Sequence, residues 1–194
     1  MTAPNDLTGL LAPLIALQRL LARFDDRGMV IGGVAASLLG KPRLTADVDA
    51  VMLVSTDDLP RLLEAAAQEG LAPRIADAEK FARHNRVLLL RHQDSSIDVD
   101  ISLGMLPFEV EAVERSVLYP LGEVAIRLPT PEDLIIFKAV AHRPKDLLDI
   151  QAIIASHPTV DRERIRYWVR EFAQALDMPE LWDDIAAWLY PSTS

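Results

Sequence analysis

Hydrophobic residues recur at helical spacing near the start of the chain. Five large apolar side chains are separated by three or four positions, as one face of a helix requires: Leu10, Leu14, Leu17, Leu21 and Phe24. We therefore predict an amphipathic helix over residues 7–24, which ends where the sequence turns to Asp-Asp-Arg-Gly. Because proline, glutamine and arginine interrupt this segment and no basic run precedes it, we expect neither a signal peptide nor a membrane span.

Short apolar runs separated by polar turns fill the middle of the chain. This pattern predicts strands at residues 29–31, 47–52, 85–91, 97–103 and 123–128. Between them the pattern predicts helices at residues 34–40, 59–68 and 107–115. The sequence His-Gln-Asp-Ser-Ser, which separates the third strand from the fourth, is typical of a turn, so a hairpin is the simplest connection between those strands.

Helical periodicity alone follows from Pro131 onward. Four helices are predicted there, separated by proline or short polar turns, at residues 131–142, 146–156, 163–176 and 179–190. The expected fold class is α/β, a sheet flanked by helices with an all-helical C-terminal part. We expect an α/β core with its N-terminal helix over residues 1–130, and a C-terminal helical region over residues 131–194 packed on that core as one structural unit.

Charge and composition narrow the class of protein. The chain has 194 residues, 50% of them hydrophobic and 25% charged, which is ordinary globular composition. The 20 basic and 29 acidic residues give a formal net charge of −9, which argues against a protein that coats a nucleic-acid backbone. Without cysteine there is no disulfide framework, no thiolate nucleophile and no sulfur-ligated zinc, and we expect a cytoplasmic location.

Candidate chemistry begins where two glycines follow a buried strand. Gly32 and Gly33 precede a predicted helix, and the backbone N–H groups and dipole at a helix start favour a phosphate. Thirteen residues after this pair, Asp47 and Asp49 alternate along a predicted strand, so both carboxylates project from one face. Paired carboxylates of this kind suit Mg²⁺ held together with substrate phosphates.

A second pair of alternating aspartates lies on a later strand. Asp98 and Asp100 share one face of the strand at residues 97–103, and carboxylates of both strands converge if the two strands are neighbours. Taken singly, two adjacent glycines more often form a plain turn, and alternating acidic residues more often mark a solvated face. Together, two such strands without a basic residue between their aspartates imply either a bound cation or an energetic cost, because close like charges repel.

Three longer segments contain these motifs: IGGVAASLLGKPRLTADVDAVM, IDVDISLGMLPFE and RLPTPEDLIIFKAVAHRPKDLLDI. Two glycines, then Asp-apolar-Asp, then a carboxylate on a later strand is the signature of the DNA polymerase β-like nucleotidyltransferases, which the chain resembles. The three segments, which span residues 31–150, are similar to one branch, the AbiEii/AbiGii-like (MenT-like) toxin nucleotidyltransferases. The resemblance implies a nucleotidyltransferase-type mixed sheet flanked by helices.

The resemblance also implies roles for individual residues. Gly32 and Gly33 approach a nucleoside triphosphate, and Asp47 and Asp49 bind the metal. The third metal-binding carboxylate is Asp100, with Asp98 as the alternative on the same strand. The other site residues that match family motifs are basic, hydroxyl or acidic side chains: Arg43, Thr45, Lys138, Arg143, Asp146 and Asp149.

The residues of the last segment also allow simpler interpretations. Lys138 lies among apolar positions of a predicted helix, so it either reaches a partner such as a phosphate or extends to solvent from the edge of the core. Asp146 and Asp149 share a helix face, and the alternative is an exposed pair between Lys145 and Asp149. Arg143 either contacts a triphosphate or is a charge at a helix end.

The function expected from the resemblance is transfer of a nucleoside monophosphate, with ATP among the candidate donors, to an acceptor hydroxyl. Two Mg²⁺ ions, or Mn²⁺ in their place, are the expected cofactors. tRNA is the acceptor that the toxin branch suggests, in a toxin–antitoxin system with a cognate antitoxin. Four arginines, three of which step by four, form either a basic face for RNA or a solvated helix side: Arg162, Arg164, Arg166 and Arg170. The alternatives are a protein acceptor, or a non-catalytic module that binds a nucleotide or a partner.

Overall fold

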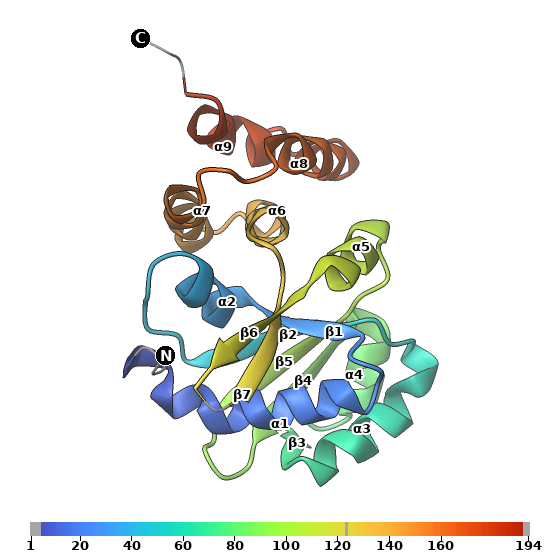
Figure 1. The fold of residues 1–194 in the computed structure, drawn as a ribbon. Coiled ribbons are helices and arrows are strands. Elements are labelled where there is room, and N and C mark those ends of the chain that lie inside the picture. The colour runs from blue at the N-terminus through green and yellow to red at the C-terminus, as the bar shows by residue number, and fades with distance from the viewer. Residues whose placement is uncertain (1–4, 123, 192–194) are drawn as a thin grey trace. The chain divides into compact units, whose positions relative to one another are not determined.

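A five-stranded mixed sheet lies at the centre of the first half of the chain (Figure 1). In the order in which they pair, its strands are β1 (Gly28–Ile31), β2 (Asp47–Met52), β5 (Asp98–Leu103), β4 (Val87–His92) and β3 (Leu71–Pro73). β2 and β5 run parallel, and every other neighbouring pair of this sheet is antiparallel. A separate antiparallel pair is formed by β6 (Val117–Leu121) and β7 (Val124–Leu128).

The structure is a computed structural model that describes residues 5–122 and 124–191. The chain divides into two units. The first unit continues to Val34 and resumes over Arg43–Pro129, so it contains all of the strands named above. The second unit comprises Ala35–Pro42 and the residues from Thr130 onward. The helix α2 (Gly32–Leu39) therefore begins in the first unit and ends in the second.

Alternation of side chains along β2 and β5 determines which face of the sheet is buried. Val48 and Ala50 on β2, and Val99 and Ile101 on β5, are fully buried. The aspartates between them are exposed or half-buried, because successive side chains of a strand point to opposite faces. The core therefore lies on the apolar face, and the carboxylates line the other.

Helices cover the sheet of the first unit (Figure 1). The helices of this unit that follow in chain order, apart from the start of α2, are η1 (Asn5–Leu10), α1 (Leu11–Ala22), η2 (Thr56–Asp58), α3 (Leu59–Gln68), α4 (Ala78–Asn85) and α5 (Pro107–Arg115). The apolar face of α1 is buried through Leu14, Leu17 and Leu21, and this helix packs against β2 and β7. α3 packs on β3, and α4 packs on β4.

Four helices make up most of the second unit: α6 (Pro131–Ala141), α7 (Pro144–Ser156), α8 (Arg162–Leu176) and α9 (Glu180–Leu189). α6 and α7 both begin with proline, whose fixed φ and missing N–H suit the first position of a helix. α8 is joined to α6 by an ion pair of 2.6 Å between Arg164 and the fully buried Asp133. Apolar residues from all four helices form the core of this unit.

The predicted fold class is confirmed, and so is the hairpin, which joins β4 to β5. One predicted strand is displaced: α4 continues to Asn85, and β4 begins at Val87 after a left-handed Arg86. Two strands and a helix were not predicted, namely β3, α4 and β6. β3 has only three residues and α4 only eight, of which Ala78 and Ala82 are buried, so each is too short to repeat its pattern more than about twice.

No helix among residues 5–122 and 124–191 is both long enough and apolar enough to cross a membrane.

We predict that Arg164→Ala lowers the free energy of unfolding by about 3 kcal/mol, because it removes the cationic partner of the buried Asp133 carboxylate. Arg166→Ala is the matched control, since Arg166 pairs with Glu163 on the exposed side of the same helix. We expect that change to cost less than about 0.5 kcal/mol. Chemical denaturation followed by circular dichroism measures both, and equal losses in the two variants would contradict the prediction.

Candidate functional site

The turn between β1 and α2 consists of two glycines that leave room for neighbouring side chains. Gly32 has a φ of +65°, a left-handed conformation that glycine adopts readily. A Cβ atom at Gly32 would overlap the carboxylate of Asp49 and lie 2.6 Å from its Cγ atom. A Cβ atom at Gly33 would overlap the hydroxyl of Thr45. Both glycines are therefore needed for Asp49 and Thr45 to lie against this turn.

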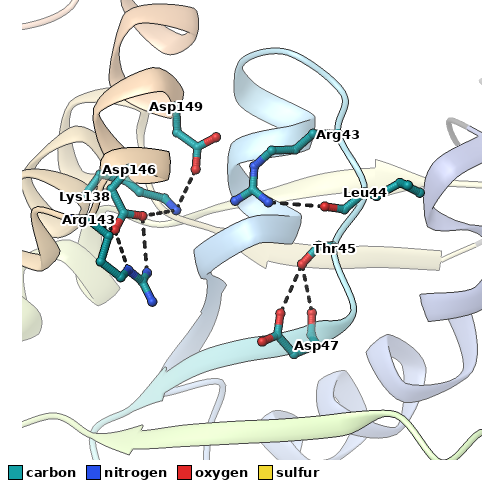
Figure 2. Close-up of polar contacts among 8 residues, drawn as sticks. All are labelled: Arg43, Leu44, Thr45, Asp47, Lys138, Arg143, Asp146 and Asp149. Atoms are coloured by element: carbon teal, nitrogen blue, oxygen red, sulfur yellow. Dashed lines mark hydrogen bonds and ion pairs between the residues drawn. The ribbon is translucent and has the colours of Figure 1, made fainter.

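The segment before β2 is held to the start of that strand by a side-chain hydrogen bond. The hydroxyl of Thr45 donates to Asp47, with its Oγ1 atom 3.1 Å from Oδ1 of the carboxylate (Figure 2). Arg43 Nη1 donates to the backbone carbonyl of Leu44 over 3.3 Å (Figure 2). Asp47 is exposed, whereas Asp49 is half-buried. Four of the predicted site residues therefore lie within residues 43–49 of the first unit, to which the glycine turn also belongs.

Parallel pairing of β2 with β5 brings the two aspartate pairs side by side. The register pairs Asp47 with Asp98 and Asp49 with Asp100. Neighbouring strands are about 4.8 Å apart, so side chains of paired residues on one face are close. The two strands are neighbours, which is the condition on which the predicted convergence of carboxylates depended. Because Ile31 on β1 pairs with Asp49 from the other side, the glycine turn adjoins the same carboxylate.

Two arginines bind the aspartates of β5. Arg74 Nη2 lies 2.6 and 2.8 Å from the two carboxylate oxygens of Asp100, and its Nη1 lies 3.5 Å from Asp98. Arg91 Nε donates to Asp98 over 2.7 Å. This hydrogen bond from Arg91 lowers the pKa of Asp98 below its ordinary value; burial acts in the opposite sense, and the charges of Arg74 and Arg91 add to the lowering. Asp98 therefore interacts with two guanidinium groups.

The sequence interpretation missed both arginines. Arg91 pairs with Asp98 across the β4–β5 hairpin, and that pairing was open to prediction once the hairpin was assigned. Arg74 follows the three-residue β3 in a segment for which no element was predicted. Its contact with Asp100 joins residues 26 positions apart, and no local pattern indicates such a contact.

The acidic side chains of the first unit fit a divalent cation in the chemistry of their donor atoms and not in their grouping. Among residues 5–122 and 124–191, no three acidic or histidine side chains are grouped as ligands of one ion. Asp49 and Asp100 are nevertheless cross-strand partners, and like charges in that position repel unless a positive charge lies near them. The guanidinium of Arg74 is such a charge. With Asp47 they offer only oxygen donors, which Mg²⁺ and Mn²⁺ prefer.

A buried ion network of the second unit contains the other predicted site residues. Lys138 Nζ lies 2.9 Å from Asp146 Oδ1 and 2.8 Å from Asp149 Oδ2 (Figure 2). The exposed fractions of these side chains are 3% for Lys138, 0% for Asp146 and 6% for Asp149, so this charge cluster is withdrawn from water. Arg143 Nε adds a contact of 2.6 Å to Asp146 Oδ2 (Figure 2).

The junction of α6 and α7 positions this network. α6 ends at the left-handed His142, and Pro144 starts α7 two residues later. Asp146, in the first turn of α7, accepts a hydrogen bond of 3.2 Å from the backbone N–H of Arg143 just before the helix. Lys138 lies in the last turn of α6. The two helix ends therefore bring oppositely charged groups together within eight residues of sequence.

Two of the simpler interpretations of this segment are wrong. Lys138 does not extend to solvent, because its ammonium group is buried between two carboxylates. Asp149 is not a member of an exposed pair with Lys145, because its own side chain is buried and contacts Lys138. Arg143 precedes α7 and binds Asp146.

The fold is nucleotidyltransferase-like, and comparison of sequences identifies the family. The chain belongs to a family described as nucleotidyltransferase of unknown function (DUF6036), whose sequence model matches residues 10–179. Among curated proteins, none matches the chain in sequence.

Solved structures show the same fold at low sequence identity. An antigenic nucleotidyltransferase-like protein from Paracoccidioides brasiliensis is 17% identical, with a TM-score of 0.54 over 97% of this chain and 94% of that one. The antibiotic-resistance factor ANT(2'')-Ia is 14% identical, with a TM-score of 0.53 over 85% of this chain and 93% of that one. These similarities support a nucleotidyltransferase-like fold for this chain.

We predict that Gly32→Ala destabilises the protein more than Gly70→Ala does, by about 2 kcal/mol or more. Both residues have positive φ, so alanine is strained at either position, but a Cβ at Gly70 meets no atom within 4 Å whereas one at Gly32 overlaps Asp49. Thermal and chemical denaturation measure the difference. Equal losses would show that Asp49 moves aside without cost.

The contribution of the buried ion network to the free energy of unfolding depends on pH. Burial would raise the pKa of Asp146, but hydrogen bonds from Arg143 and Lys138, with their charges, lower that pKa below its ordinary value. Because the lowered pKa belongs to the folded state, the stabilisation is fully present above about pH 4 and is lost as pH falls through the folded-state pKa.

We therefore expect Asp146→Asn to be less stable than the parent protein by about 3 kcal/mol at pH 7, because the buried Lys138 loses an anionic partner. The difference should be unchanged at pH 5 and shrink below about pH 4. Urea denaturation at pH 7, 5 and 3 tests this. A stability difference that stayed constant over that range would refute the assigned charge state of Asp146.

Proposed function

We propose that this protein is a divalent-metal-dependent nucleotidyltransferase that transfers a nucleoside monophosphate from a nucleoside triphosphate to an acceptor hydroxyl. The observation that supports this most directly is the pairing of Asp49 with Asp100 on adjacent strands, beside the Gly32 turn. Membership of a nucleotidyltransferase family over residues 10–179 supports the same reaction class.

The residues of the first unit take defined parts in this reaction. Asp47, Asp49 and Asp100 would hold the metal, and the Gly32–Gly33 turn at the start of α2 would offer backbone N–H groups to the phosphates. When bound, Mg²⁺ or Mn²⁺ supplies electrostatic stabilisation of the charge that develops on the phosphates. The acceptor oxygen bonds to the α-phosphorus, the bond to the bridging oxygen of the β-phosphate breaks, and pyrophosphate leaves with that electron pair. The hydroxyl proton passes to a carboxylate or to water.

The family resemblance extends the proposal to Lys138, which would neutralise charge on the triphosphate. Asp146 and Asp149 would orient that lysine, and their contacts of 2.9 and 2.8 Å with its Nζ atom support this positioning part. Arg143 would then be either a contact to the triphosphate or a support for Asp146, and its contact with Asp146 favours the support.

The toxin–antitoxin role and a tRNA acceptor rest on the resemblance to the toxin branch. A net charge of −9 does not favour a polyanionic acceptor. Of the three arginines that step by four along α8, Arg166 pairs with Glu163, and Arg170 lies 5.4 Å from the ring centre of Trp182. The acidic charge therefore favours a second candidate acceptor, a hydroxyl group of a protein.

We predict that the purified chain transfers label from one of the four α-³²P nucleoside triphosphates to total tRNA or to cell protein in the presence of Mg²⁺ or Mn²⁺. Asp49→Asn should reduce the rate by about 100-fold or more, because it removes one of the charges that hold the metal. Asp94→Asn, an exposed aspartate in the β4–β5 turn, is the matched control and should leave the rate unchanged.

After separation on a gel, the band that carries the label, RNA or protein, identifies the acceptor. Label in RNA establishes a tRNA-modifying enzyme and makes a cognate antitoxin the next question, whereas label in protein establishes protein nucleotidylation. Label that persists undiminished in Asp49→Asn refutes the proposed metal site. A chain that binds a nucleotide with metal but transfers nothing to either acceptor is a binding module, and the proposed transfer is then wrong.

A further inference from the structure

Among the described residues, Arg74 is the one whose side chain contacts both aspartates of β5. It directly follows β3, the edge strand of the sheet. Its Nη2 atom contacts both carboxylate oxygens of Asp100, at 2.6 and 2.8 Å, and its Nη1 atom lies 3.5 Å from Asp98. The backbone of Arg74 is fixed by a hydrogen bond of 3.2 Å from its N–H to the carbonyl of Leu89 on β4. The guanidinium therefore reaches the carboxylates from a fixed point beside the sheet.

Both oxygens of Asp100 are directed at the arginine. Asp100 is the cross-strand partner of Asp49, so an ion bound between these two residues needs at least one of those oxygens. Charge-assisted contacts of this length are among the stronger hydrogen bonds in proteins. Each oxygen keeps a second lone pair for a metal, but the guanidinium charge beside it repels a cation, so Asp100 binds a metal more tightly once Arg74 has moved away.

The ion pair between Arg74 and Asp100 can be broken at low cost. The side chain of Arg74 is 24% exposed and that of Asp100 is 30% exposed, so water can replace either partner. The Nε atom of Arg74 is buried and has no hydrogen-bond partner among the described residues, which makes this arrangement of the guanidinium less favourable than a fully satisfied one. Displacement of the side chain would return Nε to water.

Building on the function proposed above, we propose that Arg74 is a resident cation of the metal site: it neutralises Asp100 when no metal is bound, and it competes with the divalent ion for that carboxylate. The chain then binds free metal weakly and binds it well only when something draws Arg74 away, and a triphosphate is an anion of the right kind. Arg74 is thus a positioning residue that acts through Asp100.

The same contacts distinguish Asp100 from Asp98 as the third metal ligand. Asp98 is bound by Arg91 at 2.7 Å as well as by Arg74, whereas Asp100 is bound by Arg74 and lies opposite Asp49. Removal of Arg74 therefore frees Asp100, and removal of Arg91 loosens only Asp98. The two arginines form a matched pair for a test.

The experiment is a titration of the 194-residue chain with Mn²⁺ in the absence of nucleotide. Binding is measured by calorimetry and by the electron paramagnetic resonance signal of free Mn²⁺. We expect Arg74→Gln to bind Mn²⁺ about three- to tenfold more tightly than the parent chain, the range expected when one partly exposed ion pair is lost. Arg91→Gln should change the affinity by less than about twofold. In the double variant Arg74→Gln/Asp100→Asn the gain should disappear.

Outcomes for the inference and for the proposed function are separable. Equal or weaker Mn²⁺ binding by Arg74→Gln, in a variant whose circular dichroism shows it folded, overturns the inference and leaves the proposed function standing. A gain that survives in the double variant overturns the assignment of Asp100. Absence of Mn²⁺ binding in both the parent chain and Arg74→Gln overturns the inference together with the metal dependence, whereas binding in Arg74→Gln alone supports the inference.

Discussion

The repulsion between carboxylates on one face of the sheet is the constraint on which the first unit depends. Parallel pairing of β2 with β5 places Asp49 opposite Asp100 and Asp47 opposite Asp98. Four negative charges that close are unfavourable without positive charge beside them. The buried faces of the same strands, formed by Val48, Ala50, Val99 and Ile101, hold the register, because a slip by one residue would turn the carboxylates into the core.

Two other features of the first unit follow from that constraint. The β1–α2 turn must pass beside the Asp49 carboxylate, and only a residue without a side chain leaves the room, which accounts for Gly32. Two arginines bring positive charge to β5. Arg91 does so from the neighbouring strand β4, and Arg74 does so from the loop after the edge strand β3. These contacts offset part of the negative charge on β5.

Neutralisation of a buried charge is the corresponding requirement in the core of the second unit. Lys138 is buried, and a buried ammonium group is tolerable only with close anionic partners. Asp146 and Asp149, one turn apart on α7, are these anionic partners. Because two carboxylates face one ammonium group, the contact of Arg143 with Asp146 supplies the second positive charge. The left-handed end of α6 and the proline at the start of α7 fix the angle at which the partners meet. In both units, then, acidic residues singled out by their spacing are matched by basic residues close in space.

Local sequence determined the elements with strong periodicity, the alternation of Asp47 and Asp49 with buried residues, and the hairpin that carries Asp98 and Asp100, because these depend on neighbours within a few positions. It also singled out Lys138 as a charge among apolar positions that either has a partner or extends to solvent, and the structure decided between the two. Only the tertiary structure decided that β2 and β5 are neighbours, that Asp49 faces Asp100, and that Arg74 binds Asp100. Those contacts join residues 26 to 51 positions apart, and pairing over such distances is set by how strands assemble into a sheet, which leaves no periodic signal in the chain.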